Sequence, residues 1–153
     1  YVRIRGQWAY LYRAVDSAGN TVDFRLSPRR NVASAKAFFR KAIRSQGRSP
    51  ETITLDGYAA SHRAVRELQE QGRLPDLTKL RSSKYLNNLI EQDHRNVKSR
   101  LGPMLGLKSF TSATTTIQGI ELMHRIRKGQ FDLRGLGTQG QTPSEIWAAV
   151  LAA

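Results

Sequence analysis

Residues 1–26 alternate between apolar and polar side chains with a period of two, which is typical of β-strands. Aromatic and β-branched side chains are frequent in the middle of this segment, and a turn rich in glycine and asparagine follows at residues 16–20. The pattern therefore predicts an antiparallel meander of three strands. The predicted strands cover residues 2–5, 8–15 and 21–26.

The strand at residues 21–26 shows the alternation most clearly. Val22, Phe24 and Leu26 are expected to face the core, and Thr21, Asp23 and Arg25 are expected to face outward. The strand at residues 8–15 carries three aromatic residues, Trp8, Tyr10 and Tyr12. Aromatic residues in paired strands are usually part of the core, and stacking against nucleic-acid bases is the alternative function.

After Pro28 the apolar period changes to that of an α-helix, and helices then alternate with short strands. A strand that reaches the next strand through a helix is expected to run parallel to it with a right-handed crossover. The pattern thus indicates an α/β class with a glycine-rich link near the C-terminus. Predicted helices cover residues 31–45, 60–71, 85–100 and 111–128, with a short last helix from residue 143; predicted strands cover residues 52–55 and 77–80.

The charge balance favours a polyanionic partner. Lysine and arginine number 25 against 12 acidic residues, which gives a formal net charge of +13 and a pI near 10.9. Nucleic acid is the leading candidate partner, and a merely soluble basic surface is the alternative. There is no cysteine, which excludes disulfides and cysteine-ligated metal and favours an intracellular, cytoplasmic setting. No apolar stretch approaches the roughly 18 residues of a membrane span, so no membrane partner is expected.

Two acids carry the candidate chemistry. Asp56 ends the short apolar strand at 52–55, and Glu91 lies in the predicted helix 85–100, seven residues before Lys98. A carboxylate at a strand end and another on a helix can together hold a divalent metal ion against a phosphodiester, and a lysine nearby can hold DNA. Each acid has an alternative function. Asp56 could cap the following helix, and Glu91 could belong to an ion-pair stripe with Arg95 and Lys98.

Several strings along the chain carry a family resemblance. They are Tyr-Leu-Tyr-Arg-Ala-Val-Asp at 10–16, Leu-Ser-Pro-Arg-Arg-Asn at 26–31, Tyr-Leu-Asn-Asn-x-Ile-Glu-x-Asp-His at 85–94 and Leu-Gly-Leu-Lys-Ser-Phe at 105–110. Over about residues 1–130 the chain resembles bacterial insertion-sequence transposases of the Asp-Asp-Glu (DDE) type, in the branch named after insertion sequence six. The resemblance implies a ribonuclease-H-like (retroviral-integrase-like) fold, in which helices flank a mixed sheet. The expected organisation is a catalytic core at 1–128, followed by a link and short helix at 129–153.

The resemblance also implies a reaction: Mg²⁺-dependent DNA strand cleavage and strand transfer, with Mn²⁺ as an alternative metal. Asp56 would be the second and Glu91 the third of three metal-binding acids. The expected partners are DNA, as transposon ends and target, and further copies of the chain in a homo-oligomer. His94 could instead be structural, and Asn87 could cap the helix. The expected DNA-contacting residues are Lys98, Arg95, His94, Lys84, Asn87 and Asn88.

The family's first acid is the one departure from the pattern. It lies in an Asp-Glu-Thr-Tyr string, and this chain begins at the tyrosine, Tyr1. Asp16 starts a turn and Asp23 is expected to face outward, so neither is a good substitute. The two-metal site is therefore expected to be incomplete, and these 153 residues are expected to be inactive alone. A ribonuclease-H-like nuclease and a non-catalytic basic nucleic-acid-binding module are the alternative functions.

Overall fold

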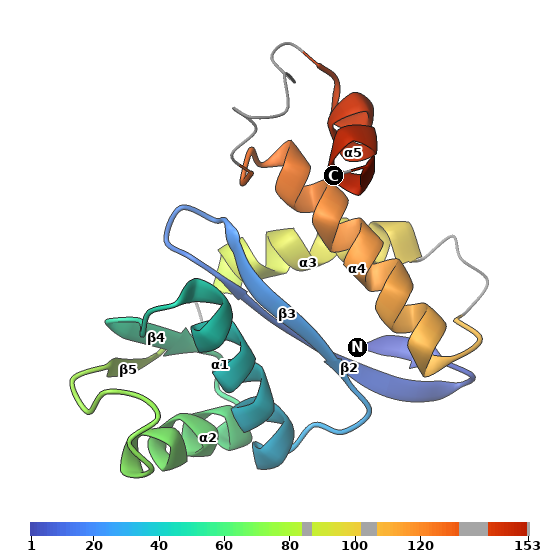
Figure 1. Cartoon of the computed structure of the whole chain (residues 1–153). Coiled ribbons are helices and arrows are strands. Elements are labelled where there is room, and N and C mark those ends of the chain that lie inside the picture. The colour runs from blue at the N-terminus through green and yellow to red at the C-terminus, as the bar shows by residue number, and fades with distance from the viewer. Residues whose placement is uncertain (84–86, 102–106, 132–140, 153) are drawn as a thin grey trace.

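The computed structural model describes residues 1–83, 87–101, 107–131 and 141–152 (Figure 1). Three strands come first, and helices then alternate with short strands from α1 to α3, as the periodicity predicts. No helix among the described residues has the length and apolar character needed to cross a membrane. The elements are β1 (Val2–Ile4), β2 (Gln7–Val15), β3 (Thr21–Ser27), α1 (Val32–Gln46), β4 (Thr52–Leu55), α2 (Ala59–Glu70), β5 (Lys79–Ser82), α3 (Asn87–Leu101), α4 (Phe110–Arg127) and α5 (Pro143–Ala152).

The predicted antiparallel meander is confirmed. β1, β2 and β3 pair in that order, with Arg3 opposite Trp8 and Leu11 opposite Leu26. The turn between β1 and β2 places Arg5 at φ 48° and Gly6 at φ 79°. Two successive residues with positive φ are typical of the type I′ turn, whose twist matches that of the strands it joins.

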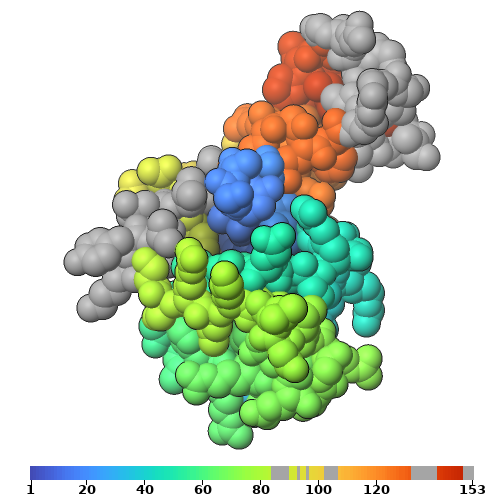
Figure 2. Space-filling view, turned by 90° about the vertical axis from the view of Figure 1, so that its left-hand side faces the viewer, coloured from blue at the N-terminus to red at the C-terminus, as the bar shows by residue number. Residues whose placement is uncertain are grey.

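Helices cover both faces of the meander. Figure 1 shows α3 and α4 on one side of the sheet and α1 and α2 on the other. On the first side, Ala113 and Ile117 of α4 pack against a buried cluster from β1, β2 and β3. On the second side, Phe38 of α1 stacks on Tyr12 of β2 with ring centroids 5.7 Å apart. Figure 2 views the molecule with the β2–β3 turn in blue between α4 in orange and the green residues of α2 and β5.

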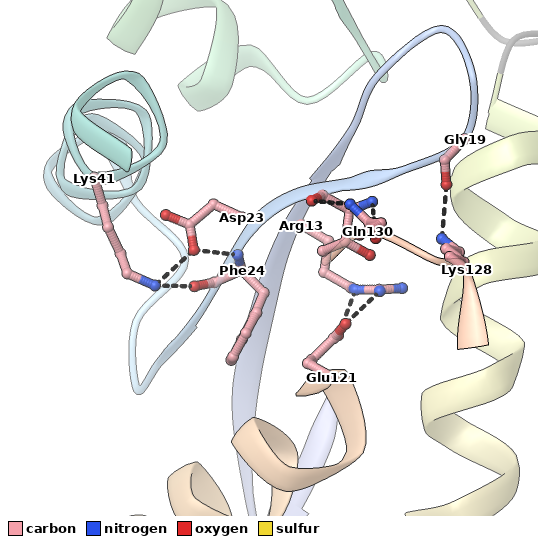
Figure 3. Close-up of polar contacts among 9 residues, drawn as sticks. Arg13, Gly19, Asp23, Phe24, Lys41, Glu121, Lys128 and Gln130 are labelled. Atoms are coloured by element: carbon pink, nitrogen blue, oxygen red, sulfur yellow. Dashed lines mark hydrogen bonds and ion pairs between the residues drawn. The ribbon is translucent and has the colours of Figure 1, made fainter. Parts of the chain in front are cut away.

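The outward assignment of two β3 residues is wrong. Thr21 and Asp23 are buried, at 3% and 8% exposed. Asp23 faces α1, and its Oδ1 accepts a hydrogen bond from Lys41 Nζ at 2.7 Å (Figure 3). A sheet covered on both faces loses the simple alternation of polar and apolar positions. A lysine on the covering helix instead neutralises the buried acid.

The second sheet is a parallel pair, β4 with β5. Its apolar side chains form a second core with α2, which contributes Val65 and Leu68. β5 lies two residues later than the predicted strand at 77–80. Leu77 is 90% exposed in the preceding turn, whereas Leu80 packs against the second core. Burial of the second leucine, not the first, therefore sets the start of the strand.

The described strands form two sheets instead of the single mixed sheet that the resemblance implies. At the edge of β1, the backbone N–H of Arg5 donates to the carbonyl oxygen of Leu107 at 3.1 Å, and Ile4 bridges to Leu107 in parallel. The segment before α4 therefore occupies the end of this edge. The mixed α/β class is confirmed, and the ribonuclease-H-like topology stays a prediction.

Candidate functional site

Asp56 lies at the carboxyl edge of the parallel pair. Leu55 is in register with Ser82, and the N–H of Ser83 donates to the carbonyl oxygen of Leu55 at 3.2 Å. Both strands therefore end together, and Asp56 follows directly after β4. The chain that leaves β5 at this same edge enters α3 at Asn87. The carboxyl edge of parallel strands is where open α/β sheets commonly bind ligands.

The carboxylate of Asp56 remains open to solvent. Its side chain is 50% exposed, and its Oδ2 lies 3.7 Å from Nη2 of Arg30. Its Oδ1 accepts a hydrogen bond from the backbone N–H of Tyr58 at 3.3 Å. Tyr58, not Asp56, is the N-cap residue of α2, so the capping alternative is wrong. The carboxylate instead shapes the turn before α2 and keeps oxygen lone pairs available for a cation.

Arg30 is held in place beside this carboxylate. Its guanidinium lies over the Tyr58 ring, 3.7 Å from the centroid, and its Nη1 donates to the Tyr1 hydroxyl at 2.9 Å. In return, the Tyr58 hydroxyl donates to the backbone oxygen of Arg30 at 2.6 Å. A cation between two aromatic rings and a carboxylate has few other orientations to adopt. Arg30 is therefore a fixed positive charge at the site.

Besides Arg30, His62 is a residue near Asp56 that the sequence pattern does not indicate. Its ring nitrogen Nε2 lies 2.9 Å from the backbone oxygen of Asp56, within hydrogen-bonding distance. When Nε2 carries a proton, His62 donates to this oxygen and thereby links the Asp56 backbone to the first turns of α2. The only signal in the sequence is a histidine six positions after Asp56, which is weak evidence by itself.

Lys98 of α3 acts on the same neighbourhood as Arg30. The pKa of the Tyr1 α-amino group is lowered from its ordinary value by desolvation and then by the positive charges of Lys98 and Arg30. Arg30 itself binds the Tyr1 hydroxyl and lies beside Asp56, so Tyr1 and the β3–α1 segment meet at the end of β4.

The other predicted residues of α3 are placed only in part. Glu91, Arg95 and Lys98 are exposed, and His94 is partly buried. Among these described α3 residues no ion pair joins Glu91 to Arg95 or Lys98, so the ion-pair stripe has no support. Asn87 and Asn88 form the start of α3, and their side chains lie outside the described residues, as does the whole of Lys84.

The candidate ligand atoms are of the type that binds a hard divalent cation. Carboxylate oxygens such as those of Asp56 and Glu91 are the ligands that Mg²⁺ prefers. Across residues 1–83, 87–101, 107–131 and 141–152, however, no group of three histidine, cysteine, aspartate or glutamate side chains is arranged to hold a metal ion. The described part of the chain therefore offers two candidate acids and not the three that the resemblance implies.

Comparison with known proteins defines the class. A family model described as a DDE domain matches residues 1–130, and the chain belongs to this family, as the catalytic domain of an insertion-sequence transposase of the branch named after insertion sequence six. No solved structure matches the chain.

Three relatives give the detail. The chain is 36% identical over 153 residues to the transposase for insertion sequence-like element IS431mec of Staphylococcus aureus strain Mu50, covering 99% of this chain and 65% of that protein. The same figures hold for the transposase for insertion sequence element IS257 in transposon Tn4003 of Staphylococcus aureus. An uncharacterized protein, pYV0051, of Yersinia pseudotuberculosis is 33% identical over 75 residues, covering 48% of this chain and 70% of that protein. The chain thus spans about 65% of the length of the staphylococcal transposases.

Proposed function

We propose that the chain is the part of a DNA transposase that performs metal-dependent strand cleavage and strand transfer. The observation that carries this proposal is the surroundings of Asp56. An accessible carboxylate at the end of β4 lies 3.7 Å from an arginine that is held over the Tyr58 ring. An acid next to a fixed cation suits a phosphodiester, whose charge needs both metal and cationic side chains.

Each residue has a distinct role in this proposal. Asp56 and Glu91 hold Mg²⁺, or Mn²⁺ in its place. When bound, the metal activates the attacking oxygen and stabilises the leaving one. Lys98 and Arg95 bind DNA phosphates, which positions the strand without reading its sequence. Arg30 places a further positive charge beside Asp56, where a phosphate oxygen can bind.

The proposal includes a limit on these 153 residues. The resemblance calls for a third acid, and the described residues bring no third acid to this place. We therefore expect metal-dependent cleavage only from a longer chain that supplies an aspartate three residues before Tyr1. The proposed division between a core at 1–128 and a C-terminal segment at 129–153 is consistent with this organisation.

The test uses that longer chain with a labelled transposon end, a target plasmid and Mg²⁺. Joined product supports a transposase, whereas cleaved ends alone support the ribonuclease-H-like nuclease. Asp56→Asn and Glu91→Gln are each expected to reduce product by more than about a hundred-fold, because metal ligands are at least as sensitive as the groups that support them. The control Asp76→Asn changes an exposed acid in the turn before β5 and should leave the product unchanged.

The non-catalytic binding module is favoured by one observation, a net charge of +13 without a described acid trio. DNA binding by the longer chain without any cleaved or joined product would support it. DNA itself is tested through salt. Log K is expected to fall with log salt by about 0.9 per phosphate contacted, and a flat dependence would remove DNA as the partner.

A further inference from the structure

The hairpin of β1 and β2 leaves an aromatic surface uncovered on the side opposite the core. Arg3 and Trp8 are directly paired across the two strands, and their neighbours Val2 and Ala9 point into the core. α1 covers this face further along, where Phe38 stacks on Tyr12. Trp8 lies beyond that cover and is 59% exposed. An indole exposed to this degree contributes little to the core, which points to binding as its use.

The side chains around Trp8 form one arrangement. The Arg3 guanidinium lies over the indole, 5.7 Å from its centroid, and its Nε also donates to the Gly6 carbonyl oxygen at 3.3 Å. The Tyr1 ring meets Trp8 edge-on at 5.9 Å and Tyr10 at 5.5 Å. We name the four residues Tyr1, Arg3, Trp8 and Tyr10 the Trp8 platform. The neighbouring rings and guanidinium limit the orientations of the indole and so reduce the entropy cost of stacking.

The platform is continuous with the candidate site. The guanidinium of Arg30 lies 5.7 Å from the centroid of the Tyr1 ring, and its Nη2 lies 3.7 Å from Asp56 Oδ2. Trp8 is therefore connected to Asp56 through only two intermediate side chains. Successive stacked nucleotides are about 3.4 Å apart along a strand, so this path corresponds to a few nucleotides.

We propose that the Trp8 platform stacks an unpaired base of the DNA strand that enters the site at Asp56. The location of that strand rests on the proposed function. Paired bases are enclosed within the duplex and cannot lie flat on an indole, so the occupant is a single-stranded nucleotide a few positions from the scissile phosphate. Arg3 then lies where it can contact the backbone of the same strand. Any base fits, because every base has a π-face.

Charge favours DNA over a second copy of the chain as the occupant. Arg3 and Arg5 are exposed on this hairpin, and the whole chain carries +13. Two copies of this basic surface would repel each other, whereas the negative phosphate backbone of DNA is attracted to it. A single exposed indole also offers much less apolar area than a stable dimer buries.

Fluorescence gives a direct test, because the chain has only two tryptophans, Trp8 and Trp147. Trp147→Phe leaves Trp8 as the only indole, and Trp8→Phe leaves Trp147. In metal-free buffer, single-stranded DNA is expected to quench the Trp8 fluorescence of the Trp147→Phe variant strongly. An abasic strand of the same length is expected to leave this fluorescence unchanged. Trp8→Phe should show no such quenching with either strand. Equal quenching by both strands, or none, would overturn the proposal.

Affinity provides the second, independent measurement. Trp8→Ala should weaken binding of the base-containing strand by at least about five-fold, while binding of the abasic strand stays the same. Trp8→Phe should retain most of the preference for bases. The control Leu77→Ala removes an exposed apolar side chain beside β5 and should change neither affinity.

Two outcomes separate this inference from the proposed function. Asp56→Asn in the longer chain should lose product and keep the full preference for bases. Unchanged product from Asp56→Asn with intact quenching would therefore sink the catalytic assignment and spare the platform. Dimerisation that depends on Trp8 in the absence of DNA, together with equal affinity for both strands, would assign this surface to a second copy and refute the platform.

Discussion

Glu121 of α4 holds Arg13 of β2 through both carboxylate oxygens. Arg13 Nη2 donates to Oε2 at 2.8 Å, and Nε lies 2.8 Å from Oε1 (Figure 3). Both side chains are fully buried. This bidentate contact fixes how α4 lies on the meander. A second contact helps at the end of α4, where Lys128 Nζ donates to the Gly19 carbonyl oxygen at 2.6 Å. The sheet that carries the Trp8 platform is therefore tied to the helix behind it.

Breaking this pair should destabilise the protein strongly. Glu121→Gln removes the carboxylate charge that contacts the buried Arg13 guanidinium, at an expected cost of about 3–5 kcal/mol in the free energy of unfolding. Replacing both residues together, as Arg13→Met with Glu121→Leu, should cost much less, because no buried charge remains. Urea denaturation measures all three. Glu70→Gln, at the exposed end of α2, is the control, and a loss below about 1 kcal/mol for Glu121→Gln would contradict the argument.

The DNA-binding role proposed for Lys98 is testable through its salt dependence. Lys98→Gln removes one exposed cation from α3. If Lys98 binds a phosphate, the slope of log K against log salt should become less negative by about 0.9. The control Lys79→Gln, at the opposite end of the β4–β5 ladder from Asp56, should leave that slope unchanged. Equal slopes for both variants would place Lys98 outside the interface.

The turn between β2 and β3 should make stability depend on pH. Burial alone would raise the pKa of the Asp16 carboxyl, but hydrogen bonds from the Asn20 side chain and from the N–H groups of Asn20 and Ala18 outweigh it and lower this pKa below 3.8. An acid whose pKa is lowered by folding stabilises the protein at pH values above its unfolded pKa. This stabilisation is lost as the pH falls through the folded pKa. The unfolding free energy of Asp16→Asn should therefore lie below that of the unaltered chain at pH 7, and the gap should close below about pH 4.

A double-mutant cycle checks the cause of that gap. In an Asn20→Ala background, Asp16 loses the side-chain donor at 3.1 Å, so the loss of stability caused by Asp16→Asn at pH 7 should shrink. A gap that keeps its full size at pH 2 would show that the charge of the carboxylate is not responsible.

The sequence predicts elements wherever the signal is local. The helix expected at 31–45 is α1, because Asn31 caps it by accepting from the Ser34 N–H at 2.9 Å and Gly47 ends it in the left-handed region. Apolar residues at helical spacing supply its buried face. These features lie within a few residues of one another, so pattern and structure agree.

The contacts that build the site join distant parts of the chain, and no local pattern encodes them. Arg30 meets Tyr1 and Asp56 only after β1, β3 and β4 are assembled. Likewise, 108 positions separate Arg13 from Glu121. Asp56 and Glu91 owe their assigned roles to the family resemblance instead of their spacing, and their joint role stays a prediction. The error at Asp23 has the same origin, since α1 covers a strand face that alternation alone assigns to solvent.

The same substitution at two glycines should have opposite effects on stability. Gly119 lies in the interior of α4, and a Cβ there would meet only Trp147 Cη2 at 3.9 Å, an ordinary contact. Gly119→Ala should therefore stabilise the chain by about 0.5–1 kcal/mol, because alanine loses less backbone entropy in a helix. Gly47 ends α1 at φ 65°, where its N–H donates to the Arg44 carbonyl oxygen at 3.2 Å. Gly47→Ala has open space around it but a conformation that costs L-residues about 1–2 kcal/mol, so it should destabilise. The melting temperatures of the two variants should shift in opposite directions from that of the unaltered chain. A shift in the same direction would mean that backbone conformation does not govern these positions.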